Sequence, residues 1–337
     1  MTTKIGINGF GRIGRLTFKT INQYHKGDLE IVAINDLTDT RTNAHLLKWD
    51  STYGRYPGEI QVTDSSFSVD GHEVRVFAER DPANIPWRSV GADIVIESTG
   101  IFTDGPKAAG HMKGGAKKVL ISAPGRNEDV TIVLGVNEEK YDRTRHNIIS
   151  NASCTTNAIA PIVKVLHQSF GITKGLMTTV HSYTNDQRIL DTVHRDLRRA
   201  RSAAMNIIPT TTGAASLVGT LIPELKGKVH GLSLRVPTPT VSIIDFVADV
   251  KQDVSLDQVT RALQTACAGP LKGIMDYTEE ELVSMDFKGN PHSSIIDGPS
   301  TMVIGGNMVK VIGWYDNEWG YSCRLGDLAA FVAKKGL

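Results

Sequence analysis

A glycine-rich segment near the N-terminus constrains the fold of this chain more than any other feature. Residues 4–8 (K-I-G-I-N) are predicted as a short buried strand, and residues 9–14 (G-F-G-R-I-G) follow it directly and open a helical stretch. Asp36 lies at the end of the next predicted strand. Glycines at this spacing let backbone N–H groups approach a pyrophosphate, the helix N-terminus adds positive charge, and an acid accepts ribose hydroxyls. In this context we predict dinucleotide binding rather than a simple tight turn.

The remainder of the N-terminal half predicts a parallel sheet. Short segments rich in Val and Ile recur, several of them separated by helical stretches, at residues 31–34, 73–77, 93–97, 118–122, 131–135 and 147–150. Alternation of strands and helices is typical of a doubly wound α/β fold. We therefore expect a Rossmann-type doubly wound parallel sheet over residues 1–153.

The pattern changes after about residue 170. Longer strand-like runs cover residues 175–183, 229–236 and 241–250, and Gly305-Gly306-Asn307 separates two apolar runs as a hairpin signal. Ser255 precedes a helical apolar pattern and can cap it.

We expect an α+β catalytic domain with a mixed or antiparallel sheet over residues 154–319. Residues 320–337, which contain a helical pattern at 325–332, are expected to pack back on the first domain.

Composition excludes several classes of protein. The 337 residues include 37 Lys and Arg against 36 Asp and Glu. The net charge is therefore too small to indicate binding to nucleic acid or to an acidic membrane. Three scattered cysteines without C-x-x-C spacing argue against a disulfide framework or a Cys-based zinc site. No apolar run is long enough for a membrane span, and no signal peptide is evident. We expect a cytoplasmic protein without metal.

Cys154 is the most informative single residue, since its neighbours are polar where a buried structural cysteine would have apolar ones. An apolar pattern at helical spacing follows it, so Cys154 is predicted in the first turn of a helix, where the helix dipole would lower its pKa. A thiolate near a dinucleotide site suggests covalent chemistry on a carbonyl, which needs a base. Of the ten histidines, His181 in T-T-V-H-S-Y-T-N-D-Q is the best candidate, although a surface or core role is more common for any one histidine.

Seven blocks along the chain resemble one enzyme family. They are I-G-I-N-G-F-G-R-I-G-R, S-N-A-S-C-T-T-N, H-S-Y-T-N-D-Q, D-L-R-R-A-R, P-T-T-T-G-A-A, L-R-V-P-T-P and W-Y-D-N-E-W-G-Y-S. Their sequence and order are similar to those of phosphorylating glyceraldehyde-3-phosphate dehydrogenases and cover essentially the whole chain. The resemblance implies oxidation of glyceraldehyde 3-phosphate to 1,3-bisphosphoglycerate with NAD and inorganic phosphate, through a hemithioacetal and a thioester on Cys154. It implies His181 as general base and a homotetramer.

The resemblance also implies the binding residues. Those for NAD are Gly9, Gly11, Arg12, Ile13, Gly14, Asp36, Arg80, Ser122 and Asn317. Those for the substrate phosphate and the attacking phosphate are Ser153, Thr155, Thr184, Arg199, Thr212, Gly213 and Arg235. Arginine gives charge-assisted bidentate bonds to phosphate, while Thr, Ser and backbone N–H groups supply neutral donors. Without the resemblance, Arg80 and Asn317 would pass for surface and turn residues, and Thr212-Gly213 for a turn.

One departure concerns the choice between NAD and NADP. Asp36 repels a 2′-phosphate and favours NAD. NAD-specific relatives usually carry Leu-Pro where this chain has Thr192-Val193, and Thr192 offers a hydroxyl to a 2′-phosphate. Secondary use of NADP is therefore a hypothesis.

Two other functions remain open at this point. One is an erythrose-4-phosphate dehydrogenase of the same fold, in which water takes the thioester; the Thr212-Gly213 pair favours phosphate as the acceptor instead. The other is an RNA-binding protein acting through its cofactor site, against which the balanced charge and the lack of interleaved aromatic and basic residues argue.

Overall fold

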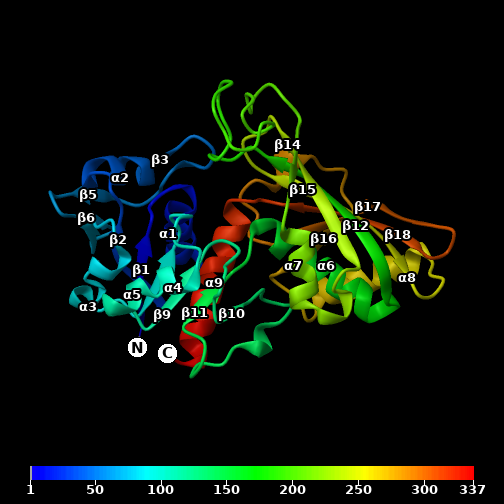
Figure 1. The fold of residues 1–337 in the computed structure, drawn as a ribbon, viewed down its shortest axis with the longest axis horizontal. Coiled ribbons are helices and arrows are strands. Elements are labelled where there is room, and N and C mark those ends of the chain that lie inside the picture. The colour runs from blue at the N-terminus through cyan, green and yellow to red at the C-terminus, as the bar shows by residue number, and fades with distance from the viewer. Residues whose placement is uncertain (1) are drawn as a thin grey trace. The chain divides into compact units, whose positions relative to one another are not determined.

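The computed structural model describes residues 2–337, which form two compact units (Figure 1). Unit 1 comprises residues up to Ile132 together with Glu138–Ala152 and Ser322–Leu337, and unit 2 comprises Val133–Asn137 and Ser153–Tyr321. The short segment Val133–Asn137 therefore lies in unit 2, although the sequence groups it with the N-terminal domain. Each unit is described by itself below.

Unit 1 contains a nine-stranded sheet in the order β10-β11-β9-β8-β1-β2-β7-β6-β5. Its strands are β1 (Thr3–Asn8), β2 (Leu29–Asn35), β5 (Ile60–Val62), β6 (Ser66–Val69), β7 (His72–Phe77), β8 (Ile94–Glu97), β9 (Lys118–Ile121), β10 (Val130–Thr131) and β11 (Ile148–Ser150). A separate hairpin is made of β3 (Trp49–Asp50) and β4 (Gly54–Arg55). Strands from β10 to β7 pair in parallel, and β6 and β5 extend the edge in antiparallel fashion.

The helices of unit 1 connect these strands. They are α1 (Arg12–Tyr24), α2 (Thr40–Lys48), α3 (Trp87–Val90), α4 (Gly105–Ala108), α5 (Gly110–Lys113) and most of α9 (Trp319–Lys335), with 3₁₀ turns at Pro82–Asn84 and Glu138–Lys140. Strands β8 and β9 are buried at every residue, as expected for strands covered on both faces. The Rossmann-type α/β expectation is confirmed.

The prediction of a strand at residues 131–135 is confirmed only for residue 131 and is wrong for the other four. Only Val130–Thr131 joins the sheet, because the N–H of Val133 donates to the Asn137 side chain at 2.8 Å instead of to a neighbouring strand. The terminal helix is longer than expected, because Asp316 accepts the N–H of Trp319 at 2.9 Å and so caps α9.

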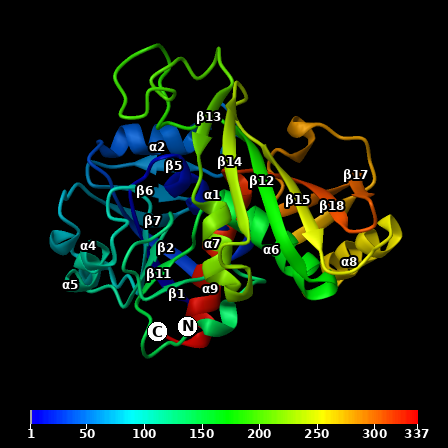
Figure 2. The same ribbon diagram turned by 45° about the vertical axis from the view of Figure 1, so that its right-hand side comes forward.

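Unit 2 contains a mixed seven-stranded sheet in the order β13-β14-β12-β15-β18-β17-β16, and most of its strands can be followed side by side in Figure 2. The strands are β12 (Ile172–Ser182), β13 (Ile208–Thr211), β14 (Val229–Val236), β15 (Ser242–Val250), β16 (Met275–Thr278), β17 (Ser294–Ile304) and β18 (Met308–Tyr315). The helices are α6 (Cys154–Phe170), α7 (Ala214–Leu221) and α8 (Leu256–Ala268), with 3₁₀ turns at Pro223–Leu225 and Ser284–Phe287.

Helices α6, α7 and α8 pack against the sheet of unit 2 through a buried core that includes Ile162, Leu166, Phe246 and Val311. Alternate residues of β15 are buried along its whole length, which shows that these helices cover only one face. Residues 183–207, between β12 and β13, have no helix or strand and form the long loop at the top of Figure 1.

Local expectations in unit 2 are confirmed. Ser255 and Gln258 form a reciprocal capping box at the start of α8. Gly305 and Gly306, with φ of +61° and +83°, turn the chain between the antiparallel strands β17 and β18.

Candidate active site

The glycine turn of unit 1 lies at the point where the strand order of its sheet reverses. Strand β1 has β2 on one side and β8 on the other, and the crossovers lead outward in both directions. Ligands of open α/β sheets bind beyond the carboxyl ends of strands at such a switch point. Gly9 follows β1 and Ser98 follows β8, so these two turns border the expected crevice.

The three glycines of this turn serve different purposes. Gly9 has φ of +88°, and a Cβ atom there would lie 2.7 Å from the N atom of Thr99. A Cβ on Gly14 would lie 2.1 Å from the Gly9 carbonyl oxygen. A Cβ on Gly11 would meet no atom within 4 Å. The protein's own packing thus requires Gly9 and Gly14, whereas the open space at Gly11, beside the start of α1, fits the approach of a pyrophosphate.

Asp36 is held in place at the carboxyl end of β2. Its two carboxylate oxygens accept the N–H of Phe10 at 2.8 Å and of Thr38 at 2.9 Å. The first bond ties the acid to the glycine turn. A fixed carboxylate at this place suits ribose hydroxyls. Arg12, the first residue of α1, pairs with the buried carboxylate of Asp50 at 2.7 Å.

The other three cofactor candidates have fewer contacts. Ser122 directly follows β9, and its N–H donates to the Glu97 carbonyl at 2.9 Å, so it belongs to the same row of strand ends. Ile13 is half-buried in α1, and Arg80 is exposed beyond β7. The last cofactor candidate, Asn317, belongs to unit 2.

A buried polar network beneath this row of strand ends was not foreseen from the sequence. Trp87 donates to Nδ1 of His111 at 3.0 Å, so the ring carries its proton on Nε2 and donates to Glu97 at 2.9 Å. Glu97 also accepts from Asn8 at 2.6 Å and from the N–H of Thr99 at 2.8 Å. These bonds satisfy a buried carboxylate and fix the turn that follows β8.

In unit 2 the first turn of α6 carries Cys154, as expected. Ser153 is the N-cap, and its hydroxyl accepts the N–H of Thr156 at 3.1 Å. The N–H groups of Cys154 and Thr155 are among those that a helix leaves without an intrahelical partner. They are available to an oxyanion that forms near the thiol.

His181 lies beside this thiol, with Nε2 at 3.5 Å from Sγ of Cys154. Its other ring nitrogen, Nδ1, lies 2.6 Å from the Ser182 carbonyl oxygen. A carbonyl only accepts, so Nδ1 carries the proton and Nε2 presents a lone pair to the thiol. Arg235 donates to the same carbonyl at 3.1 Å, and its NH1 atom also lies 2.8 Å from Nδ1. Because both of these nitrogens carry hydrogens, the second contact is not a hydrogen bond, and the closer carbonyl oxygen decides the tautomer. The geometry suits transfer of the thiol proton to Nε2.

The pKa values of the pair differ from the sequence expectation. Burial raises the pKa of the Cys154 thiol, and Arg235 and the hydrogen bond of Thr155 oppose this without reversing it. Burial and the positive charge of Arg235 lower the pKa of His181 to about 3. The sequence predicted a lowered pKa for the Cys154 thiol. For the protein without a bound ligand this prediction is wrong, because the effect of burial on the pKa is larger than that of the helix N-terminus. Both groups are neutral at rest, and His181 is free to accept a proton.

A tyrosine under the thiol was also missed. The buried hydroxyl of Tyr315 lies 2.9 Å from the hydroxyls of both Thr155 and Thr179. Thr155 in turn lies 4.0 Å from Sγ of Cys154. The hydroxyl of Thr155, expected to meet phosphate, is thus engaged by Tyr315, and its N–H is the group left for an anion. Tyr315 lies in an apolar run and gives no sequence signal.

Two of the remaining anion-site candidates, Arg235 and Thr184, lie beside His181. Arg235 and Thr184 are 3.2 Å apart, and Arg199 donates to Thr210 at 2.9 Å. The Nε atom of Arg235 is buried and has no hydrogen-bond partner among the described residues. An unpartnered buried donor of this kind fits an external anion. Thr212 and Gly213 precede α7, and a Cβ on Gly213 would point into open space, which also suits an anion at a helix N-terminus.

Asn317 is joined to Ser182, the residue after His181, by a short relay within unit 2. The N–H of Ser182 donates to the Ser242 hydroxyl at 3.1 Å, and that hydroxyl donates to Oδ1 of Asn317 at 2.9 Å. The relay fixes the orientation of the buried amide, whose nitrogen is left to donate.

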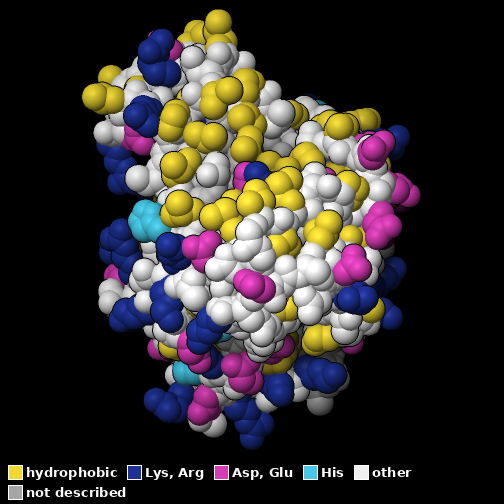
Figure 3. Space-filling model, turned by 90° about the vertical axis from the view of Figure 1, so that its right-hand side faces the viewer, with side chains coloured by type: hydrophobic (Ala, Val, Ile, Leu, Met, Phe, Trp, Pro, Cys, Tyr) yellow, Lys and Arg dark blue, Asp and Glu magenta, His cyan; other side chains and the backbone are white. Residues whose placement is uncertain are grey.

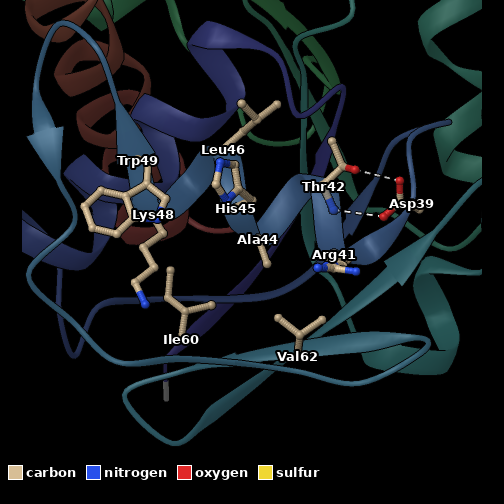
Figure 4. Close-up of a pocket in the computed structure, with 10 residues that line it drawn as sticks. All are labelled: Asp39, Arg41, Thr42, Ala44, His45, Leu46, Lys48, Trp49, Ile60 and Val62. Atoms are coloured by element: carbon tan, nitrogen blue, oxygen red, sulfur yellow. Dashed lines mark hydrogen bonds between the residues drawn. The ribbon is translucent and has the colours of Figure 1, made fainter.

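A hollow of about 640 Å³ lies elsewhere in unit 1, beside α2 and β5 (Figure 4). Its walls include Arg41, Lys48, Trp49 and Val62, and none of the expected site residues lines it. Among residues 2–337, no group of three or more His, Cys, Asp or Glu side chains could hold a metal ion. No helix in this part of the chain is long and apolar enough to cross a membrane.

Comparison with known proteins identifies the family. Residues 3–105 match the model for the NAD binding domain of glyceraldehyde 3-phosphate dehydrogenase, and residues 153–317 match that for its C-terminal domain. The chain belongs to the glyceraldehyde-3-phosphate dehydrogenase family. It is 59% identical over 337 residues to the glyceraldehyde-3-phosphate dehydrogenase of Geobacillus stearothermophilus, covering 100% of both chains.

Two further bacterial relatives agree. The chain is 58% identical over 335 residues to glyceraldehyde-3-phosphate dehydrogenase 2 of Streptomyces avermitilis, covering 99% of this chain and 100% of the relative. It is 57% identical over 337 residues to glyceraldehyde-3-phosphate dehydrogenase 1 of Bacillus subtilis, covering 100% of both. Family membership confirms the resemblance on which the sequence expectations depend.

The site geometry predicts that the three free thiols differ in reactivity. Cys154 has a cation and a base beside it, whereas burial and Asp276 raise the pKa of Cys267 to about 12 and Cys323 is buried. Iodoacetamide at neutral pH should therefore label Cys154 first, as followed by peptide mass spectrometry. Arg235→Gln should slow this labelling, because it removes the charge that opposes burial, while Arg201→Gln serves as control. Equal labelling of all three thiols in the folded protein would contradict this account.

Proposed function

We propose that this chain, an NAD-dependent oxidoreductase, converts glyceraldehyde 3-phosphate and inorganic phosphate to 1,3-bisphosphoglycerate. The observation that carries the proposal is the contact of 3.5 Å between Sγ of Cys154 and Nε2 of His181, made at a helix N-terminus within a family of this name. The names of the relatives favour neither erythrose 4-phosphate nor RNA as the main ligand.

The residues of unit 2 divide the chemistry among them. Sγ of Cys154 attacks the aldehyde carbon while its proton passes to Nε2 of His181, and the N–H groups of Cys154 and Thr155 stabilise the oxyanion of the hemithioacetal. His181 returns this proton to the oxyanion, which gives the hydroxyl of the hemithioacetal, and takes it back as the hydride leaves and the carbon is oxidised to a thioester. Inorganic phosphate attacks the thioester carbon, and the Cys154 thiolate leaves and is reprotonated.

NAD, when bound, supplies the acceptor for the hydride that leaves the hemithioacetal carbon. The residues proposed to hold it in unit 1 are Gly9, Gly11, Arg12, Ile13, Gly14, Asp36, Arg80 and Ser122. The open space at Gly11 and the fixed carboxylate of Asp36 support this assignment. Asn317 is proposed to bind the nicotinamide amide.

The phosphate groups are proposed to bind Ser153, Thr155, Thr184, Arg199, Thr212, Gly213 and Arg235. The buried, unpartnered Nε of Arg235 supports the assignment, since a buried guanidinium donor without a partner is costly unless an anion supplies one. The start of α7 at Ala214 supports a second anion position.

We also propose a cytoplasmic homotetramer. The three cysteines are free, as expected in a reducing compartment. On the face of the unit 2 sheet away from its helices, Leu176 pairs with Val247 on the neighbouring strand, and Lys310 separates Val247 from Met302 in the same row. Seen from the side of β17, β18 and α8, hydrophobic side chains form a band across the upper part of the surface (Figure 3). Such a band suits pairing with another copy.

The catalytic proposal predicts that Cys154→Ala abolishes oxidation but leaves NAD affinity nearly unchanged. His181→Asn should lower kcat by about a hundred- to ten-thousandfold, because the thiol and hydroxyl protons then have no acceptor. A coupled assay at saturating NAD measures both.

Leaving out inorganic phosphate should stop steady-state turnover after one acylation. Continued turnover without phosphate would contradict the phosphorylating reaction.

Secondary use of NADP is the weaker of the cofactor proposals. With NADP, kcat/KM should lie within about a thousandfold of the value with NAD, a difference of about 4 kcal/mol. Asp36→Asn should reduce the difference in kcat/KM between NAD and NADP, because it removes the negative charge that repels a 2′-phosphate. A larger gap in the unsubstituted protein means that NADP is not used.

The assembly proposal predicts that Leu176→Glu dissociates the tetramer, because an exposed apolar residue of the sheet face becomes a charge. Light scattering after gel filtration measures the mass. Ile101→Glu is the matched control, since Ile101 is similarly exposed but belongs to unit 1. A tetramer that survives Leu176→Glu unchanged places the interface on another surface.

A further inference from the structure

Asp186 lies among the residues proposed above to bind phosphate, although it carries the opposite charge. It is part of the loop at residues 183–207 and pairs with NH1 of Arg199. It also accepts the hydroxyl hydrogen of Thr184. Both of its hydrogen bonds to other residues thus come from proposed phosphate donors. Its negative charge is also the one that most stabilises the positive charge of Arg235.

The hydrogen-bond pattern leaves Thr184 without a donor for phosphate. A hydroxyl has one hydrogen, and that of Thr184 points to Asp186. Its oxygen accepts from NH1 of Arg235 at 3.2 Å. Thr184 therefore behaves as an acceptor toward the cation and a donor toward the carboxylate. A phosphate oxygen can receive the Thr184 hydrogen only if Asp186 gives it up.

Two of the five N–H donors of the Arg199 guanidinium are directed at other residues of the same protein. Its Nε donates to Thr210 at 2.9 Å, and Asp196 lies 3.7 Å away on the same side. The terminal nitrogen NH1 points to Asp186. Asp196 also accepts the N–H of Arg198 at 2.9 Å and the hydroxyl of Thr210 at 3.2 Å, whereas the bonds that Asp186 accepts from other residues come from Thr184 and Arg199. Asp186 is thus the carboxylate that an incoming anion can displace.

We propose that Asp186 is a tethered counter-anion that competes with a phosphate group for Thr184 and Arg199 and thereby sets the specificity of the site. This inference rests on the proposed function, which assigns phosphate to these residues. A phosphate dianion carries more charge and more acceptor oxygens than a carboxylate and displaces Asp186. A singly charged carboxylate ligand gains nothing over the aspartate already present, so the site discriminates against it.

In the opposite role, Asp186 would orient Arg199 for phosphate. Loss of the carboxylate would then weaken the binding of phosphate instead of strengthening it. Competition is favoured because the only hydroxyl hydrogen of Thr184 and one N–H of the NH1 group of Arg199 are directed at the carboxylate rather than at a third group. The two roles are separated by whether loss of the charge strengthens or weakens the binding of phosphate.

Asp186→Asn is the variant that tests the proposal. It keeps an oxygen acceptor for Thr184 and removes the charge that pairs with Arg199. The KM for the phosphate-bearing ligand should fall about three- to tenfold, the range expected for a half-exposed charge pair, with little change in kcat. Asp191→Asn is the matched control, because Asp191 forms an exposed pair with Arg201 at 2.7 Å in the same loop, away from Thr184. The control should leave each KM as it is.

Three substrates distinguish which phosphate Asp186 competes with. A lower KM for inorganic phosphate at saturating aldehyde assigns competition to the attacking phosphate. A lower KM for glyceraldehyde 3-phosphate, with no change for unphosphorylated glyceraldehyde, assigns it to the substrate phosphate. Acetate should inhibit the Asp186→Asn variant more than the unsubstituted protein. An unchanged or higher KM for both phosphate-bearing ligands overturns the proposal.

Arg199→Gln separates this inference from the function beneath it. If Arg199→Gln raises the KM for a phosphate ligand and Asp186→Asn does not lower it, the counter-anion role alone is wrong. If Arg199→Gln changes neither KM, Arg199 holds no phosphate and both assignments fail. Protection of Cys154 from iodoacetamide by inorganic phosphate gives a binding readout that does not depend on turnover.

Discussion

The pairing of β12 with β14 is the constraint on which the catalytic geometry depends. These strands run in parallel, and their register makes His181 and Arg235 direct partners. A slip of one residue would turn one of the two side chains to the other face of the sheet. With the observed register, backbone hydrogen bonds bring together the proposed base His181, the Ser182 carbonyl and the half-buried Arg235, and α6 needs only to bring Cys154 to them.

The same pairing explains why the resting site is neutral. Arg235 acts on two titratable groups at once, since its charge lowers the pKa of His181 and opposes the effect of burial on Cys154. An ion pair of thiolate and imidazolium would place a second cation beside Arg235 in a desolvated pocket. A neutral imidazole with its lone pair toward the thiol avoids that repulsion and is ready for proton transfer when a carbonyl arrives.

Local signals allowed much of this arrangement to be predicted from the sequence. The glycine turn, the helix start at Cys154 and the capping serine at 255 follow from residue types at fixed spacing, and the structure has all three. The contacts of the Tyr315 hydroxyl were not predicted, because its partners Thr155 and Thr179 lie more than a hundred residues away in the chain. The pairing of Asp186 with Arg199 was not predicted, because both lie in a loop without periodic structure, whose path the sequence does not indicate. The sign of the Cys154 pKa shift was wrong for a related reason: a helix start is visible in sequence, whereas the depth of burial is set by the whole fold.

The long loop at residues 183–207 has a consequence for how enzymes on this scaffold can diverge. Thr184, Asp186 and Arg199 lie on it, whereas Cys154 and His181 lie on a core helix and a central strand. Substitutions in the loop face solvent and disturb little packing, while substitutions around α6 and β12 disturb the core. The proposed anion-binding residues can therefore change by mutation while the proposed acyl-transfer residues stay fixed, which makes this loop the part of the fold where a new substrate preference would first evolve.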